Sequence, residues 1–334
     1  MWQFMSWFTN LTGFREESPE QVRANLEVEG TSLKSRVNGR TFVCGRLETP
    51  SLGQLRERVR TAGAKVGKTS LGEVVASVQD LHRDVSNAGA LFQVASQFNL
   101  LEMVSPAVTP EDGVEIYEHD YTQGPACAIA AGAGTIYRNY FAAVNGRIGQ
   151  TADNQIDCLA DLGEALGNAD NRLWKMKNGY ALPPATALQE ISDRLQASGA
   201  GEIDRWRQLH RIGIQWQTQV TLGGAKHQVT QAYCSALPVA YGHRDPELWK
   251  EFAQLVLDAA YEATLCAGIL NFIETGNHKV FLTLLGGGAF GNDIEWILGA
   301  ILRAVRRHRD SGLDVAIVSY GSSKAYLREL SGRL

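Results

Sequence analysis

The sequence predicts an α/β fold, because its carboxyl-terminal third alternates apolar strands with an amphipathic helix. Residues 279–285 (KVFLTLL) and 314–320 (DVAIVSY) are apolar runs of the length of buried strands. Between them, apolar residues recur at helical spacing from Ile294 to Val305. Since a strand–helix–strand crossover is right-handed, the two strands are predicted to pair in parallel beneath a covering helix.

Earlier segments predict further elements from short apolar runs and helix-capping residues. These elements are a helix over 52–59, strands over 74–78, 90–95 and 227–241, and a helix over 246–268. Asp245 and Pro246 have the order of a helix cap and a first-turn proline. Asn292 and Glu295 have the spacing of a capping box for the last predicted helix.

The chain is predicted to form one core with two additions. Its 334 residues correspond to one elaborated domain or two modest ones. Residues 71–334 form the predicted α/β domain, and the charged, irregular residues 1–70 form an extension packed on it. Residues 145–215, approximately, are polar with amphipathic helical periodicity, so they are predicted to be a helical insertion in the domain.

Composition excludes several classes of protein. With 44% hydrophobic and 20% charged residues, 34 Gly and 9 Pro, the chain is neither disordered nor collagenous. A net charge of -4 gives no field that would hold a polyanion, so general nucleic-acid binding is not expected. Small phosphorylated ligands remain compatible with this charge, because backbone amides bind them without cationic side chains.

The amino-terminal segment and the cysteines bear on cellular location. Residues 1–14 are apolar but lack the basic start of a signal peptide and the roughly 20 residues of a membrane span. We interpret them as a docking arm whose Trp2, Trp7 and Phe8 pack on the domain, with a membrane-surface contact as the alternative. Five scattered cysteines without a C-x-x-C pair predict reduced thiols in a cytoplasmic protein.

A glycine-rich loop follows the predicted strand over 279–285. Its sequence LGGGAFGN ends at a predicted helix start, where glycines allow close backbone approach and free N–H groups attract anions. No Gly-Lys-Ser/Thr follows, so this is not a Walker A loop. We predict phosphate binding here, by Gly286, Gly287, Gly288, Ala289, Phe290, Gly291 and Asn292.

A second small-residue segment, TQGPACAIAAGAGTIYRNYF, covers 122–141. Each helical glycine costs roughly 0.8–1 kcal/mol relative to alanine. Gly132 and Gly134 therefore suggest that a ligand or backbone approaches this helix closely. Polar residues precede the segment, just past a predicted strand, where open α/β sheets place ligands. They are Gln97, Asn99, Glu102, Glu111, Asp112, Glu118 and Asp120.

In this order the segments resemble the macrodomain superfamily, and most closely its poly(ADP-ribose) glycohydrolase-like members. The likeness lies in VASVQDLHRDVSNAGALFQVASQFN, in the 122–141 segment and in the helix, strand and GGGAFGN loop near the carboxyl terminus, and covers roughly 74–141 and 225–322. It implies a three-layer α/β/α fold with a mixed central sheet. It further implies an ADP-ribose or ADP-ribosylated ligand and hydrolysis of ADP-ribosyl linkages. No cofactor or metal is expected.

The resemblance also implies roles for individual residues. Asp80, or else Asp84, would hold the adenine amine, and Asn99 the distal ribose. Residues 286–292 would bind the diphosphate, with Phe290 packed on the ribose. Gln123 and Gly124 lie in the first ligand loop.

The catalytic part of the family pattern is missing. The glycohydrolases follow their glutamine with two glutamates, one of them catalytic, whereas Gly124 and Pro125 follow Gln123 here. A triglycine expected after the first buried strand is replaced by the acidic stretch 100–121. Hydrolysis of a glycosidic bond needs an acid and a base. The candidates are Asp120, slightly preferred for its position three residues before the glutamine, with Glu118 and Glu102.

Two other functions remain open. The same glycine loops would serve a noncatalytic module that binds ADP-ribose or another nucleotide. A cysteine hydrolase is the further alternative, because Cys127 lies near a predicted helix start, where thiol pKa values fall, and His227, His243 or His278 could act as its base. No H-x-x-x-H or H-E-x-x-H motif suggests a zinc site.

Overall fold

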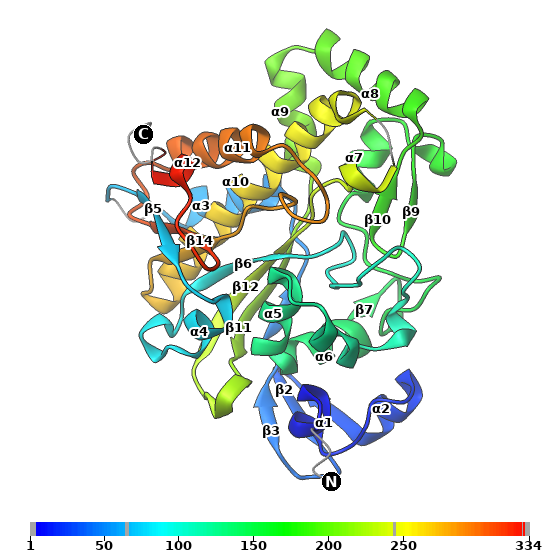
Figure 1. The fold of residues 1–334 in the computed structure, drawn as a ribbon, viewed down its shortest axis with the longest axis vertical. Helices are drawn as coiled ribbons and strands as arrows, with labels where there is room; N and C mark the ends of the chain where they lie inside the picture. The colour runs from blue at the N-terminus through cyan, green and yellow to red at the C-terminus, as the bar shows by residue number, and fades with distance from the viewer. Residues whose placement is uncertain (1–4, 64–66, 243–244, 329, 331–334) are drawn as a thin grey trace.

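A seven-stranded mixed sheet forms the centre of the computed structural model, which describes residues 5–63, 67–242, 245–328 and 330 (Figure 1). In spatial order its strands are β4 (Arg46–Glu48), β11 (Gly213–Gln219), β12 (Gln228–Cys234), β6 (Leu91–Ala95), β13 (Lys279–Leu282), β14 (Asp314–Ser319) and β5 (Ser70–Val75). From β12 to β5 the strands run parallel, and β11 is antiparallel to both of its neighbours. The predicted parallel pair is confirmed as β13 and β14.

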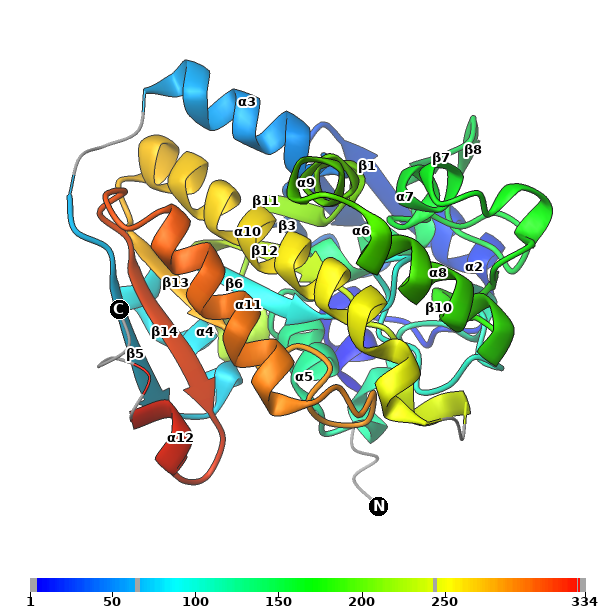
Figure 2. The same cartoon turned by 90° about the horizontal axis from the view of Figure 1, so that it is seen from above.

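Helices cover both faces of the sheet (Figure 2). One layer consists of α3 (Leu52–Ala62), α9 (Ala200–Leu209), α10 (Lys250–Thr275) and α11 (Ile294–Arg307), with α8 (Ala185–Ala197) packed on α10. The other layer consists of α4 (Val78–Arg83), α5 (Gln123–Ala130) and α6 (Gly132–Tyr140). The predicted three-layer α/β/α class with a mixed sheet is therefore confirmed.

Helix α10, which precedes β13, packs against the other helices of the first layer. Asp245 caps it through a 3.0 Å bond from the Glu247 amide, and the 3₁₀ turn Pro246–Trp249 continues into α10. The sequence predicts an end at Gly268, but the helix continues to Thr275 and is capped by Gly276 in the left-handed conformation. Gly268 lies inside the helix, where a Cβ would meet the Val280 side chain at 2.7 Å. The segment Pro246–Thr275 is long and apolar enough to cross a membrane, yet 83% of its most apolar window is buried in the protein.

Two predicted boundaries differ from the structure. The strand predicted over 74–78 is β5, which ends at Val75, and Val78 already begins α4. The predicted capping box at Asn292 does not form, because Asp293 caps α11 by accepting the Glu295 amide at 2.8 Å. The Asn292 amide group instead donates to the Leu237 carbonyl at 2.8 Å, which ties the glycine loop to the segment after β12.

The amino-terminal residues form a small subdomain and also contribute to the core. Its elements are α1 (Trp7–Thr12), α2 (Pro19–Asn25) and an antiparallel sheet of β1 (Leu26–Glu29), β2 (Ser32–Ser35) and β3 (Thr41–Val43). Phe8 is fully buried, and the Trp7 ring occupies the space that Gly132 leaves open, whereas Trp2 lies outside the described residues. Gly134 likewise makes room for the Thr218 hydroxyl, so protein atoms explain both glycines of α6.

The predicted insertion contains hairpins as well as helices. Its elements before β11 are β7 (Ala143–Val144), β8 (Arg147–Ile148), α7 (Ala160–Ala165), β9 (Lys175–Lys177), β10 (Tyr180–Leu182), α8 and α9. Short 3₁₀ turns are η1 (Val85–Asn87), η2 (Pro110–Asp112), η3 (Glu115–His119), η4 (Ala169–Asn171), η5 (Leu222–Gly224) and η6 (Val239–Gly242), and α12 (Ala325–Arg328) follows β14. The β9–β10 hairpin brings Tyr180 to the lining of a cavity at the carboxyl ends of the parallel strands.

Candidate active site

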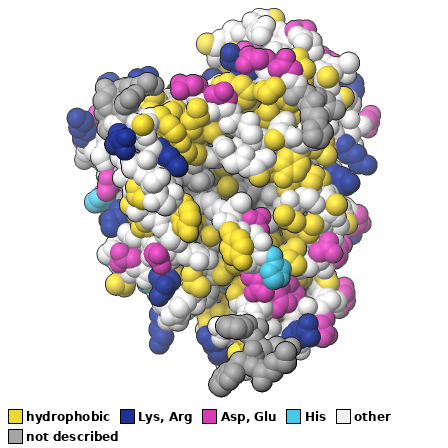
Figure 3. Space-filling view, viewed as in Figure 1, with side chains coloured by type: hydrophobic (Ala, Val, Ile, Leu, Met, Phe, Trp, Pro, Cys, Tyr) yellow, Lys and Arg dark blue, Asp and Glu magenta, His cyan; other side chains and the backbone are white. Residues whose placement is uncertain are grey.

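A cavity of about 620 Å³ opens at the carboxyl ends of β6, β12 and β13, beside the amino terminus of α5. Figure 3 shows the hollow in the middle of this face, with hydrophobic side chains around it and acidic ones within it. We call it the first cavity. Parallel strands that end together present free backbone groups and loops at one edge, which is where sheets of this class bind ligands.

The glycine loop forms one wall of the first cavity. Gly286, Gly288, Ala289 and Phe290 line it, while Gly287 and Gly291 are exposed outside the lining and Asn292 is buried behind it. Within the described residues, the backbone N–H groups of Gly288, Ala289 and Phe290 have no hydrogen-bond partner. Three successive free amides at one concave edge form a site suited to an anion.

The glycines of this loop have different structural roles: two are required by the turn, and one borders open space. Gly286 and Gly291 have φ angles of 75° and 69°, and a Cβ on either would meet Ala236 or Ala240 within 3 Å, so the turn itself requires them. A Cβ on Gly288, by contrast, would meet no protein atom within 4 Å. The loop therefore keeps open space at Gly288 that its own packing does not demand.

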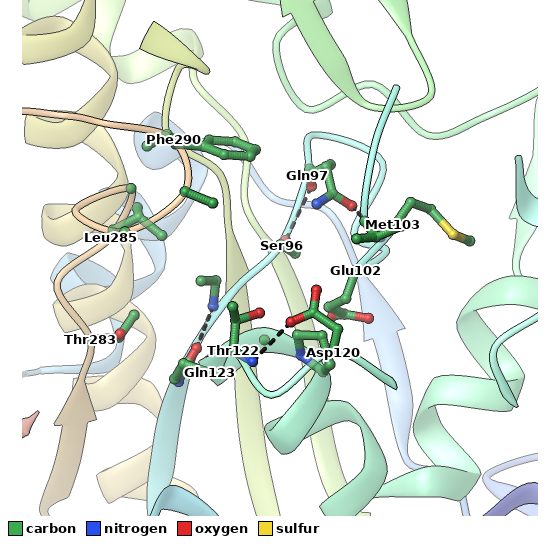
Figure 4. Close-up of a pocket in the computed structure, with 18 of the residues that line it drawn as sticks. Ser96, Gln97, Glu102, Met103, Asp120, Thr122, Gln123, Thr283, Leu285 and Phe290 are labelled. Atoms are coloured by element: carbon green, nitrogen blue, oxygen red, sulfur yellow. Dashed lines mark hydrogen bonds between the residues drawn. The ribbon is translucent and has the colours of Figure 1, made fainter. Parts of the chain in front are cut away.

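Carboxylates form the opposite wall. Figure 4 shows Glu102 and Asp120 close together on one side of the cavity and Phe290 on the other. The Asp120 carboxylate accepts the Thr122 amide at 2.9 Å, which holds it at the start of α5. Glu102 is only 3% exposed and reaches the cavity from the loop after β6. An acid and a base for a reacting group in the cavity are therefore both available.

The surroundings of Glu102 change its protonation. Burial raises the pKa of this carboxyl from 4.5 to about 7, although the Arg138 guanidinium and the Tyr117 hydroxyl oppose the rise. Arg138 lies 3.4 Å from Oε1 and 3.5 Å from Oε2, which is too far for a tight bidentate pair. Glu102 can therefore carry a proton near neutral pH, as a general acid must.

The start of α5 closes the floor of the cavity. The Gln123 side chain accepts the Ala95 amide at 2.9 Å and donates to the Gln93 carbonyl at 2.8 Å, so it completes the hydrogen bonding of β6. A Cβ on Gly124 would lie 2.0 Å from the Ala95 carbonyl oxygen, so only glycine fits there. Both residues line the cavity while their identities serve the packing of α5 on the sheet.

Three predicted site residues lie apart from the first cavity. Asn99 is fully buried, and its side chain donates to Gln155 at 2.8 Å and accepts the Leu101 amide. Glu118 accepts the Trp7 amide at 3.4 Å and lines neighbouring hollows. Asp80 is exposed on α4 and pairs with Arg83, and its alternative Asp84 caps the following turn.

A second cavity of about 630 Å³ adjoins the first. It lies between the β5–α4 junction and the segment after β14, with Tyr320 and Lys324 in its lining. The two cavities share the residues Asp120, Tyr121, Thr122, Gln123, Thr283 and Leu284. Together they form a long cleft across the carboxyl ends of the parallel strands.

An aromatic cluster closes the far end of the first cavity. The ring centroids of Tyr180, Tyr241 and Phe290 lie 5.2–5.5 Å from one another. They come from the β9–β10 hairpin, from η6 and from the glycine loop. The ring planes are inclined to one another by 44–74°, so the cluster forms an angled apolar wall that suits packing against a sugar or another ring.

The geometry disfavours the cysteine alternative. Cys127 is fully buried, and burial raises the pKa of its thiol well above the ordinary value, which opposes thiolate formation. Of the proposed bases, His227 bonds through Nε2 to the His82 carbonyl at 2.8 Å, His278 contacts the Phe272 ring, and His243 lies outside the described residues. No group of His, Cys, Asp and Glu suited to a metal occurs among the described residues.

Comparisons with known proteins find similarity to solved structures alone. No family model and no curated protein matches the chain. A poly(ADP-ribose) glycohydrolase from Thermomonospora curvata aligns over 94% of this chain and 95% of its own, with 11% identity and a TM-score of 0.44. The glycohydrolase from Deinococcus radiodurans in complex with ADP-ribose aligns over 85% and 90%, with 13% identity and a TM-score of 0.45. The chain is similar in fold to these enzymes, as the sequence predicts.

Sequence reasoning missed several residues of the site. Tyr180 and Tyr241 lie in segments read as insertion and strand, so nothing local marks them as an aromatic wall. Arg138 is fully buried beside Glu102, and Tyr117 bonds to the Glu102 amide at 3.1 Å. An arginine within a helix of small and apolar residues was the available signal, since arginine is rarely buried without a specific partner.

Proposed function

We propose that this protein binds ADP-ribose in the cleft and hydrolyses an ADP-ribosyl linkage. The observation that supports it is one cavity with free backbone amides on one wall and two carboxyl groups on the other. The amides of residues 288–290 suit a diphosphate, and the carboxyls suit the bond at the distal ribose. The sequence resemblance to the macrodomain superfamily supports the same ligand.

The long cleft suits the length of the ligand. In the proposed pose the diphosphate lies at the glycine loop and the distal ribose packs beside Phe290 in the first cavity. The adenosine then extends into the second cavity, where Tyr121 and Tyr320 offer aromatic faces for a base. This pose leaves the C1″ atom of the distal ribose near Glu102 and Asp120.

Hydrolysis in this pose divides the proton transfers between the two carboxyl groups. Glu102, protonated by virtue of its burial, donates a proton to the leaving oxygen as the C1″–oxygen bond breaks. A water molecule forms the new bond to C1″ and gives its proton to Asp120. The nearby negative charge stabilises the oxocarbenium-like transition state, and the two carboxyl groups then exchange the proton through solvent.

Calorimetry with ADP-ribose and assays of its release from ADP-ribosylated protein, nucleic acid and small molecules test the proposal. We expect Glu102→Gln to reduce turnover by about 10²- to 10⁴-fold, the usual contribution of a general acid, while binding persists. Glu16→Gln is the matched control, because Glu16 is a half-buried carboxyl whose pKa is also raised by burial but which lies outside the cleft. Absence of binding at millimolar ADP-ribose by folded protein would refute the proposal.

A noncatalytic ADP-ribose-binding module is the second candidate. Gly124 favours it, since this position follows the glutamine as the family's glutamate does, yet it has no room for a Cβ. The same assays separate the two candidates. Tight binding without release of ADP-ribose from any substrate, in wild type and Glu102→Gln alike, would favour the module.

A further inference from the structure

Arg138 is a charged side chain enclosed completely by the protein. Its Nε donates to the Leu100 carbonyl at 3.1 Å, and Nη1 donates to the Tyr233 hydroxyl at 2.5 Å. Its Nη2 faces the Thr135 hydroxyl at 3.3 Å and both oxygens of Glu102. An enclosed guanidinium is costly unless its donors are met, so this position is specified by several partners at once.

A second set of contacts fixes the guanidinium from the sheet side. The Tyr233 ring lies 3.6 Å from the guanidinium carbon, in a cation–π contact. The Tyr233 hydroxyl in turn donates to the Gln231 side chain, whose amide group donates to the Cys127 carbonyl at 2.9 Å. Strand β12 and helix α5 thus determine where the arginine points, and its one ionic partner among the described residues opens on the first cavity.

We infer that Arg138 is the positioning residue for Glu102, and that Tyr233 holds the guanidinium in the orientation that places this carboxyl in the cavity wall. The role of Glu102 in turnover rests on the proposed function, whereas the contact between the two side chains does not. A bidentate pair at shorter distance would bind the carboxylate tightly and disfavour its proton. The observed separation orients Glu102 while burial keeps it able to carry a proton.

Other groups around Glu102 take part in its titration. Those that face it are Tyr117 from η3, Asp120 after η3, Cys127 from α5, Arg138 from α6 and Tyr233 from β12. Of these, Arg138 contributes the fixed positive charge. Removal of that charge therefore has a defined sign: the neutral carboxyl is favoured and the titration of Glu102 moves to higher pH.

Infrared titration of the ligand-free protein tests the inference without substrate. The carboxylic C=O band that Glu102→Gln removes identifies the group. We expect Arg138→Met to raise the midpoint of this band by about one pH unit or more, as loss of an adjacent opposite charge does. An unchanged midpoint in a variant with native circular dichroism would overturn the inference, whether or not the protein hydrolyses ADP-ribosyl linkages.

Tyr233→Phe tests the second contact and also serves if Arg138→Met does not fold. It keeps the ring but removes the hydroxyl, so we expect a shifted midpoint and turnover lowered by about 10-fold or more at unchanged ADP-ribose affinity, since misplacing a catalytic group by an ångström costs up to about 100-fold. Tyr140→Phe is the matched control, because its hydroxyl bonds to Glu16 away from the cleft. If the midpoint of the Glu102 band were the same in Tyr233→Phe as in Tyr140→Phe, the role of Tyr233 would be overturned.

Discussion

The two walls of the first cavity are built in different ways. The glycine loop is one continuous segment, and its turn depends on Gly286 and Gly291 within the loop. The carboxylate wall is assembled from distant parts of the chain, since Glu102 contacts both Arg138 and Tyr117. The wall proposed to bind the ligand is therefore a local property of the sequence, whereas the wall proposed to react depends on the packing of the whole core.

The largest predicted effect on stability concerns the carboxylate wall, and it is a dependence of the unfolding free energy on pH. The folded-state pKa of Glu102 is raised from 4.5 to about 7, so ionising this carboxyl costs stability as pH rises through that range. At about 1.4 kcal/mol per pKa unit, we expect Glu102→Gln to gain a few kcal/mol relative to wild type between pH 4.5 and 7. Denaturant unfolding of both proteins across this range measures the difference.

The difference between the two proteins should be constant below pH 4.5 and above pH 7, because Glu102 then has the same charge in the folded and unfolded chains. Groups common to both proteins cancel in this comparison. If the difference in unfolding free energy did not change with pH, the pKa of Glu102 would be the same in the folded and unfolded chains. The carboxylate wall would then not alter the protonation of Glu102.

The same contrast explains what the sequence could predict. The sequence predicts strands β13 and β14 and the glycine loop, because apolar runs and clustered glycines are patterns within a single segment. It does not predict the role of Arg138, because that role depends on Glu102, 36 residues away, and on Tyr233, 95 residues away. A local pattern contains no information on which distant side chains will share a buried space.

Residues transferred by resemblance are a separate case. The resemblance places Asn99 at the distal ribose, but its side chain is occupied by Gln155 and by the Leu101 amide. The resemblance places Gln123 in a ligand loop, and in the structure it lines the first cavity while its side chain completes the hydrogen bonds at the end of β6. A resemblance predicts where a residue lies in the fold. Its hydrogen-bond partners depend on the neighbouring loops, and here the stretch 100–121 replaces the family's triglycine.

Two glycines of one cavity provide the next test. Gly124→Ala forces a Cβ to within 2.0 Å of the Ala95 carbonyl oxygen, so we expect a loss of stability of about 1–3 kcal/mol, typical of overpacking. Gly288→Ala enters open space and should leave stability unchanged or slightly higher. Thermal unfolding of both variants measures the contrast, and equal losses would contradict the difference in packing between the floor of the cavity at Gly124 and the glycine loop at Gly288.

The affinity for ADP-ribose tests the role of the glycine loop. Gly288→Val fills the open space beside the free amides and should weaken ADP-ribose binding by roughly 10- to 100-fold, which corresponds to about 1.4–2.7 kcal/mol of charge-assisted hydrogen bonding. Gly72→Val is the control, since Gly72 also has open space around it but lies in β5 outside both cavities. Calorimetry gives both affinities, and unchanged binding by Gly288→Val would remove the loop from the site.

The smallest effect is expected at Cys127, which is buried on α5 and takes no part in the proposed reaction. Its thiol is buried and protonated, and the Gln123 amide group donates to its sulfur at 3.2 Å. Cys127→Ala should cost about 1 kcal/mol of stability, as loss of one buried group does, and leave turnover unchanged. Complete loss of turnover with normal ADP-ribose binding would instead place the thiol in the reaction, and the carboxylate wall would then serve only to shape the cavity.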